Sequence, residues 1–378
     1  MNFINPTKVN KYNNLLICMD KKLPPTCIDN YQKLSVDHLI ETDPNVYLEL
    51  NDASKASKAK TRINIDIEIN TISDILQLIV QYKLDETIEY NINLKSLYDI
   101  EKPLRELNNM IGMTALKQNI VDQVLYFIQD FHYSGDFMHT VIYGPPGTGK
   151  TEIAKIIGAI YCKLGILKKG VFKKVTRSDL IAGYLGQTAV KTKDVIQQCL
   201  GGVLFIDEAY ALGNSEKKDS FSKECLDTLC ESLSDHKHEL MVIIAGYENE
   251  LNDCFFSYNQ GLDSRFTWRF KTDTYRAEDL YNIFLKNVRD IGWTAVDISV
   301  DWFKTNLESF PFFGRDMETL LTKVKIAHSK RVFCKPDEKR KIIFIDLEKG
   351  FKMYMSNENV LKKKEKERFN QIVSSIYL

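Results

Sequence analysis

The sequence lacks an excess of charge of either sign, and it lacks long apolar runs. Its 378 residues contain 51 Lys and Arg against 51 Asp and Glu, so no overall basic field indicates a bulk binder of nucleic acid or membranes. No apolar run reaches the roughly 18 residues that a membrane-spanning helix needs, so we expect none. The first residues show no basic stretch followed by an apolar one, so we also expect no signal peptide. The composition that remains is that of a soluble globular protein, long enough for two or three domains.

Patterns for metal ions and disulfides are missing as well. None of the eight cysteines lies in a Cys-x-x-Cys, and none of the six histidines lies in a His-Glu-x-x-His. His236 and His238 flank Lys237, whose charge would repel a cation. Scattered cysteines in a chain of this length are typical of reduced thiols, so we expect a cytoplasmic protein. Frequent Asn and Ile hint at an AT-rich, viral genome, in which case the compartment is the host cytoplasm.

The first region, residues 1–105, has no readable chemistry and an unknown role. Ile63, Ile65, Ile67 and Ile69 alternate with polar residues, a pattern that predicts a half-buried strand over 63–69. A helix-capping residue at position 71 or 73 precedes the next apolar stretch, which predicts a helix. We therefore expect a partly folded α+β region.

Residues 106–272 alternate between strand and helix patterns, which predicts an α/β domain with a parallel sheet and helices on both faces. Leu116, Ile120, Val124 and Ile128 share one face of a helix that covers this sheet. The predicted strands span 139–143, 171–175, 203–206 and 240–245, and a helix follows the first strand from residue 151 to about 164.

From residue 273 to 378 the apolar spacing is helical, which predicts an α-helical domain. Its last stretch, 361–378, begins with a basic run. We interpret this run as one charged face of a helix, with a partner or nucleic-acid contact as the alternative.

Residues 144–151 fit the pattern Gly-x-x-x-x-Gly-Lys-[Ser/Thr], which a chain of this length would match by chance about one time in a hundred. Glycines allow the loop to curl so that backbone N–H groups face phosphate oxygens, and the following helix adds its positive dipole end. Lys150 is expected to bridge the β- and γ-phosphates, and the Thr151 hydroxyl to bind Mg²⁺. The predicted loop consists of Gly144, Pro145, Pro146, Gly147, Thr148, Gly149, Lys150 and Thr151.

A second motif places two acids directly after the predicted strand 203–206. The carboxyl edge of such a sheet is where ligands bind in open α/β folds. Asp207 is expected to hold Mg²⁺, and Glu208 to polarise an attacking water as a general base. A base beside the magnesium ligand favours hydrolysis over transfer, because the acceptor is water. No Asn-Lys-x-Asp motif is present, which argues against GTP.

With these motifs in this order, residues 107–350 resemble the AAA+ ATPases, and among them the CbxX/CfxQ family that includes red-type Rubisco activase. Residues 110–113, with Ile111 and Gly112, are similar to the family's linker that touches adenine, and 183–188, with Tyr184, to its first pore loop. The resemblance implies ATP and Mg²⁺ as ligands, an AAA+ core with a C-terminal helical lid, and a homo-oligomeric ring, with six subunits in the family.

The resemblance also implies roles for two arginines. Arg265, in residues 261–266, matches the arginine finger that reaches the nucleotide of the next subunit, and Arg269 is a second candidate. Arg315 matches the sensor-2 arginine at the start of a lid helix. Many AAA+ proteins carry Asn or Thr at the end of the fourth strand to position the lytic water. Residues 245–247 here read Ala-Gly-Tyr, which leaves the sensor-1 residue open.

Three function classes follow from this reading. The leading interpretation is an ATP-driven remodeller of an unidentified protein client, in which Tyr184 grips polypeptide in a central channel. The alternative is a nucleic-acid motor or loader, for which a basic channel would be needed; Lys191 and Lys193 lie close behind Tyr184, but no nucleic-acid module is visible. A scaffold with a vestigial ATPase is disfavoured because the set of Lys150, Asp207, Glu208 and Arg265 is intact.

Overall fold

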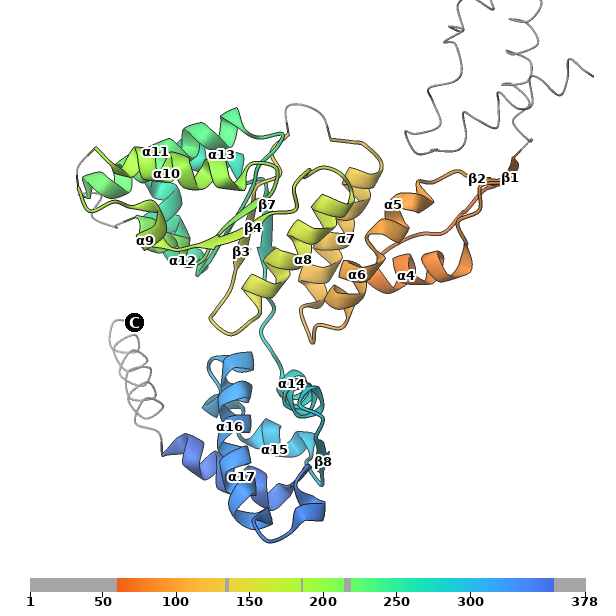
Figure 1. Cartoon of the computed structure of the whole chain (residues 1–378), viewed down its shortest axis with the longest axis vertical. Helices are drawn as coiled ribbons and strands as arrows, with labels where there is room; N and C mark the ends of the chain where they lie inside the picture. Colours follow the sequence, from red (N-terminus) through yellow and green to blue (C-terminus); the bar gives the residue numbers. More distant parts are fainter. Residues whose placement is uncertain (1–59, 133–135, 185, 214–218, 357–378) are drawn as a thin grey trace, which may run out of the picture. The chain divides into compact units, whose positions relative to one another are not determined.

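The computed structural model describes residues 60–132, 136–184, 186–213 and 219–356 (Figure 1). The expected basic helix over 361–378 and most of region 1–105 lie outside the described residues. The chain divides into two units, one of residues 1–61 with 86–89 and one of residues 62–85 with 90–378. Apart from residues 61, 88 and 89, every feature discussed below lies in the second unit.

The centre of the second unit is a five-stranded parallel sheet in the order β4-β5-β6-β3-β7. Four of its strands match the predicted ones within one residue at either end. The fifth, β7, was not predicted, because its four residues at the sheet edge show only a short alternation. The strands are β3 (Thr140–Tyr143), β4 (Phe172–Val175), β5 (Val203–Ile206), β6 (Met241–Gly246) and β7 (Trp268–Lys271).

Helices cover both faces of the sheet, as the alternating pattern predicted. On one face, Val141, Leu204 and Val242 pack in a buried cluster with α10 and α11. On the other, Ile142 and Phe205 pack with α7 and α8. The helices of this part are α7 (Thr114–Ile128), α8 (Lys150–Lys163), α9 (Arg177–Leu180), α10 (Thr188–Cys199), η2 (Ala209–Leu212), α11 (Ser220–Asp235), α12 (Glu248–Glu250), η3 (Leu251–Phe255), η4 (Phe256–Tyr258) and α13 (Gln260–Arg265).

The strand predicted over 63–69 is wrong, because regular pairing ends at Ile63. Beyond it the backbone of Ile65 pairs with a side chain: its N–H donates to Asn91 Oδ1 (2.8 Å), and its carbonyl accepts from Asn91 Nδ2 (3.0 Å). One amide side chain thus replaces a neighbouring strand. The expected cap is Thr71, which forms a capping box with Asp74. The elements here are β1 (Thr61–Ile63), α4 (Ile72–Gln81), β2 (Ile88–Tyr90), α5 (Leu94–Asp99) and α6 (Glu101–Asn108).

The region after residue 273 is helical as predicted, with one addition. Two short strands, β8 and β9, pair in parallel. Nearby, the buried carboxylate of Asp346 accepts bonds from Arg331 Nε (2.8 Å) and lies 3.0 Å from His328 Nδ1. The elements are α14 (Ala277–Asp290), β8 (Thr294–Val296), α15 (Val300–Thr305), η5 (Leu307–Ser309), α16 (Phe313–Val332), η6 (Pro336–Glu338), β9 (Lys341–Ile343) and α17 (Phe344–Met355). Among the described residues, no helix combines the length and apolarity that crossing a bilayer requires.

A buried histidine ties the start of the sheet together. His139 Nδ1 accepts from the Val242 N–H (3.1 Å), and Nε2 lies 3.1 Å from the Leu233 carbonyl. Burial lowers the pKa of His139 to about 4, with Arg265 adding to the effect and the bond to Leu233 opposing it. The folded protein therefore holds this ring neutral where an exposed histidine takes up a proton.

This burial predicts a pH dependence of stability. Between about pH 6.5 and 4 the unfolded chain binds a proton that the folded chain excludes, so the free energy of unfolding falls as the pH drops. Between pH 7 and 5 we expect the wild type to lose about 2 kcal/mol more than His139→Asn, which keeps an acceptor for Val242. Urea unfolding at both pH values measures the difference, and equal losses in the two proteins would contradict the assignment.

Candidate active site

The loop after β3 is built so that backbone can approach a ligand. Gly147 and Gly149 have φ of 79° and 81°, in the left-handed region that favours glycine. Gly147 has a further reason to lack a side chain, since a Cβ there would lie 2.0 Å from the Phe312 carbonyl oxygen. Helix α8 begins directly after the loop at Lys150, so its N-terminus faces the same space.

Lys150 places a cation at the floor of this loop. The residue is only 7% exposed, and Nζ donates to the carbonyls of Gly144 (2.8 Å) and Pro145 (2.9 Å). Burial lowers the pKa of Lys150, while Glu208 and Asp207 act in the opposite direction. An anion bound in front of this ammonium would complete its environment.

Asp207 follows β5 and lies beside β4. The parallel register sets Val175 opposite Ile206, which brings the preceding Lys174 within reach of the acid. The Lys174 ammonium contacts Asp207 Oδ2 at 2.5 Å. A ligand of Asp207 therefore competes with one fixed cation for the carboxylate.

Glu208 turns away from the strand direction. Its φ is 53°, a left-handed value that is uncommon for a residue with a side chain. The hydroxyl of Tyr210, in η2, donates to Glu208 Oε2. Burial, followed by the bond and charge of Glu208, raises the pKa of Tyr210, so the phenol stays protonated as a donor.

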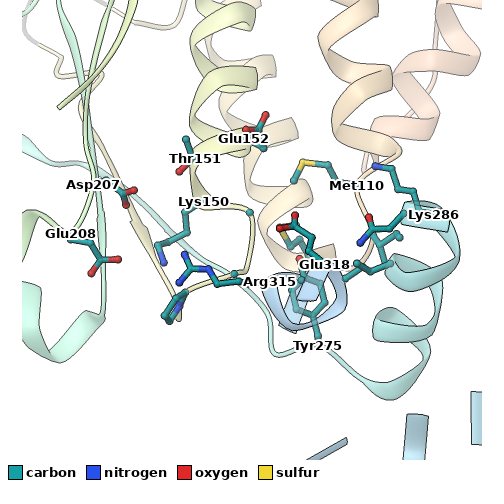
Figure 2. A pocket seen from close by; sticks show the side chains of 18 residues that line it. Met110, Lys150, Thr151, Glu152, Asp207, Glu208, Tyr275, Lys286, Arg315 and Glu318 are labelled. Carbon is teal, nitrogen blue, oxygen red and sulfur yellow. The ribbon is translucent and has the colours of Figure 1, made fainter. Parts of the chain in front are cut away.

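The loop, the two acids and the later helices enclose one pocket of about 370 Å³. Figure 2 shows Asp207 and Glu208 on one side and Met110 on the other, with Lys150 and Arg315 between them. One end thus carries Asp207 and Glu208, whereas the other mixes apolar side chains with the charged Glu152, Lys286 and Glu318. This combination suits a ligand with a polyanionic part and a flat apolar part. The apolar side chains of this second end are Met110, Ile111, Met113, Tyr275 and Ile283, with Lys286 and Asn287 beside them.

The start of α16 reaches the pocket because it is bonded to the loop. The Gly314 N–H donates to the Gly147 carbonyl (3.1 Å), and Arg315 follows on the pocket wall. The buried Asp316 carboxylate accepts from the Phe312 N–H (2.6 Å), which fixes this helix start. Arg315 is therefore held facing the same space as Lys150.

The structure brings most of the predicted site residues to this pocket and places others elsewhere. Gly144 and Pro145 contribute carbonyls to Lys150. Thr148 is buried and donates to the Pro145 carbonyl (2.8 Å), and Gly112 packs on Tyr275. Arg265 and Tyr184 lie outside the pocket of their own chain. The predicted residues that line it are Ile111, Pro146, Gly147, Gly149, Lys150, Thr151, Asp207, Glu208 and Arg315.

Several residues at the site were missed from the sequence. Lys174 could have been found, because it is near the end of a strand adjacent to the acids. Tyr210 stands two residues after Glu208, but a turn had to be known before its hydroxyl could be placed. Lys286 and Asn287 come from α14, about 80 residues past the acids, and no local pattern marks them.

The donor set fits a magnesium ion. Thr151 offers a hydroxyl and Asp207 a carboxylate, both on the pocket wall beside Lys150. Hard oxygen donors of this kind, few in number, are what Mg²⁺ takes beside the phosphates of a nucleotide. When bound, such an ion neutralises phosphate charge.

The sheet is parallel, with a glycine-rich loop after β3 and two acids after β5, and β6 lies between these two strands. This arrangement defines a P-loop nucleotide-binding protein. Comparison with known proteins narrows this class. Residues 140–270 match the family described as "ATPase family associated with various cellular activities (AAA)". The chain is 36% identical over 363 residues to a cfxQ-like protein of Acanthamoeba polyphaga mimivirus, an alignment that covers 94% of this chain and 84% of the relative.

Two further similarities cover less. Stage V sporulation protein K of Bacillus subtilis is 39% identical over 194 residues, 50% of this chain and 59% of that protein. The crystal structure of the FIGL-1 AAA domain in complex with ADP superposes with a TM-score of 0.47 at 19% identity, over 69% of this chain and 89% of that one. The chain belongs to the AAA+ ATPase family, in its CfxQ-like branch.

Removing the buried cation should remove nucleotide binding. We expect Lys150→Ala to weaken ATP binding by about 100-fold or more, since charge-assisted contacts to two phosphates are lost. Titration with a fluorescent ATP analogue measures this affinity. Lys163→Ala is the matched control, because Lys163 is an exposed lysine at the far end of the same helix and does not line the pocket. Equal affinity of Lys150→Ala and wild type would refute the phosphate role.

Proposed function

We propose that the protein is a Mg²⁺-dependent ATPase that remodels protein clients as a homo-oligomeric ring. The observation that carries the proposal is the convergence of Lys150, Thr151, Asp207, Glu208 and Arg315 on one pocket. We further propose a division into a region 1–105 of unknown role, an ATPase domain over 106–272 and a lid over 273–378. The contact between Gly147 and Gly314 joins the ATPase domain to the lid at the nucleotide.

Each pocket residue has one task in this proposal. Lys150 and the loop amides bind the β- and γ-phosphates, and Thr151 and Asp207 hold the metal ion. Asp207, which pairs with Lys174 in the structure, would give up that pairing to hold the ion. Glu208 accepts a proton from the attacking water as general base. Arg315 contacts phosphate from the lid, so that binding draws lid and core together and hydrolysis releases them.

Arg265 is proposed to act on the nucleotide of a neighbouring subunit. Its guanidinium donates to Ser234 Oγ (2.7 Å) and the Gly261 carbonyl (2.6 Å), outside its own pocket. Arg269 is more fully engaged, by Asp263 (2.7 Å), by the Tyr143 hydroxyl (3.0 Å) and by the Phe256 ring. A site completed only by a neighbour favours a closed ring, and AAA+ proteins generally assemble as rings.

The segment around Tyr184 supports a protein client. Tyr184 is 75% exposed and Val190, at the start of α10, is 61% exposed. The lysines behind them are already engaged, because Lys191 Nζ donates to the carbonyls of Ser178 (2.6 Å) and Ile181 (2.9 Å). Lys193 pairs with Glu231 (3.3 Å). The segment therefore offers apolar side chains for polypeptide rather than cations for phosphate.

One arginine links this segment to the ATP site. Arg177 begins α9, which leads to Tyr184, and its guanidinium donates to the carbonyls of Ala211 (2.7 Å) and Leu212 (3.3 Å) in η2. It also pairs with Asp219 (2.6 Å). Since η2 follows Glu208 directly, a shift of the acids is transmitted to the segment that carries Tyr184.

Mixed subunits test the shared site. We expect Arg265→Ala and Glu208→Gln to be inactive alone, the second while still binding ATP, because loss of a general base costs about 100- to 10,000-fold in rate. When mixed, an intact finger can face an intact pocket, and ATPase activity should partly return. The steady-state ATPase rate against mixing ratio is the measurement. Arg269→Ala mixed in the same way is the comparison, and rescue there but not with Arg265→Ala would reassign the finger.

Tyr184→Ala tests the client contact. Because the side chain is exposed and far from the pocket residues in sequence, we expect unchanged basal ATPase and melting temperature. Stimulation of the ATPase rate by an unfolded polypeptide substrate should fall about 10-fold or more, because the Tyr184 ring no longer contacts the bound polypeptide. Val80→Ala, another exposed apolar residue, is the control. Stimulation by single-stranded DNA instead of polypeptide would favour the nucleic-acid motor.

A further inference from the structure

The end of β6 provides no short polar side chain to hold the general base. Ala245, Gly246 and Tyr247 occupy this position, adjacent to the strand that carries the acids. The hydroxyl that reaches Glu208 comes instead from Tyr210. We propose that Tyr210 is a positioning residue, whose hydroxyl fixes the orientation of the Glu208 carboxylate. This inference rests on the proposed function, in which Glu208 is the general base.

The ring of Tyr210 is held in place by its surroundings. Gly246 has no left-handed φ, so its backbone does not demand glycine. Space is tight, however: a Cβ at Gly246 would lie 3.0 Å from Tyr210 Cδ1 and 3.1 Å from Leu251 Cγ, so that these side chains would have to shift by a few tenths of an ångström. The Tyr247 ring lies on another side, with its centroid 6.3 Å from that of Tyr210. The glycine therefore makes room for the ring that carries the hydroxyl.

The attached segment is fixed as well. Tyr210 lies in η2, whose last two carbonyls are bonded to Arg177. Glu208 itself is held at a left-handed backbone position. A rigid donor facing a carboxylate restricts its rotamers, which is what a base aimed at water requires.

The test is Tyr210→Phe, which removes one oxygen and keeps the ring. We expect kcat for ATP hydrolysis to fall about 10- to 100-fold, the effect of one hydrogen bond to a charged group. The affinity for a fluorescent ATP analogue should stay within about twofold, since Tyr210 does not line the pocket. Tyr258→Phe is the matched control, because it loses a bond to the Asp219 carbonyl (3.0 Å) and Tyr258 packs, like Tyr210, against the same buried cluster.

Two combinations separate positioning from general damage. In a Glu208→Gln background, Tyr210→Phe should lower the residual rate no further, because both changes remove the same function. Gly246→Ala, which displaces the ring with its hydroxyl intact, should also lower kcat about 10-fold while ATP still binds. It also serves as the test if Tyr210→Phe does not fold.

The outcomes distinguish this inference from the proposed function. The positioning role alone is overturned when the wild type hydrolyses ATP and the kcat of Tyr210→Phe or Gly246→Ala stays within twofold of the wild-type value. Additive losses in the Glu208→Gln background overturn it too. A wild type that binds ATP without hydrolysing it defeats the proposed function first.

Discussion

The buried ammonium of Lys150 is the constraint on which the rest of the site depends. A cation removed from water needs acceptors around it, and here two loop carbonyls accept its hydrogen bonds. The negative charges of Glu208 and Asp207 favour its charged form. The carbonyls reach the ammonium because the loop after β3 is tight. The acids are near it because β5 ends at the same edge of the sheet, with β6 between the two strands. The strand order, the glycines and the helix start at Lys150 all meet these demands. A polyphosphate is the partner that matches the remaining open side.

The proposed lid contacts the phosphate loop through backbone atoms at the start of α16. The Phe312 carbonyl fits against Gly147 only because that residue has no Cβ, and the Gly314 N–H bonds the same residue. The absence of a side chain at Gly147 is therefore needed both for the conformation of the phosphate loop and for its contact with the start of α16. A side chain there would separate Arg315 from the cation it accompanies.

The sequence predicted what is encoded locally and missed what depends on neighbours in space. Lys150, Asp207 and Glu208 were identified because the motif and the strand ends set them at one sheet edge. The strand over 63–69 was wrong, since period-two spacing also fits an extended chain that pairs with the side chain of Asn91. Lys174 and Tyr210 depend on the register of β4 with β5 and on the turn after Glu208. The contacts of the lid depend on residues more than 100 positions away, for which no spacing rule exists.

The exposed segment around Tyr184 has two anchored ends. Arg177 ties the leading end to η2, and Lys191 ties the trailing helix to the carbonyls of Ser178 and Ile181. The conformational entropy of these ends is lost once, when the chain folds, and not at every encounter with a client. On the proposed function, preorganisation of this kind lowers the entropic cost of each contact between the Tyr184 ring and a client, so that the same ring serves many successive contacts.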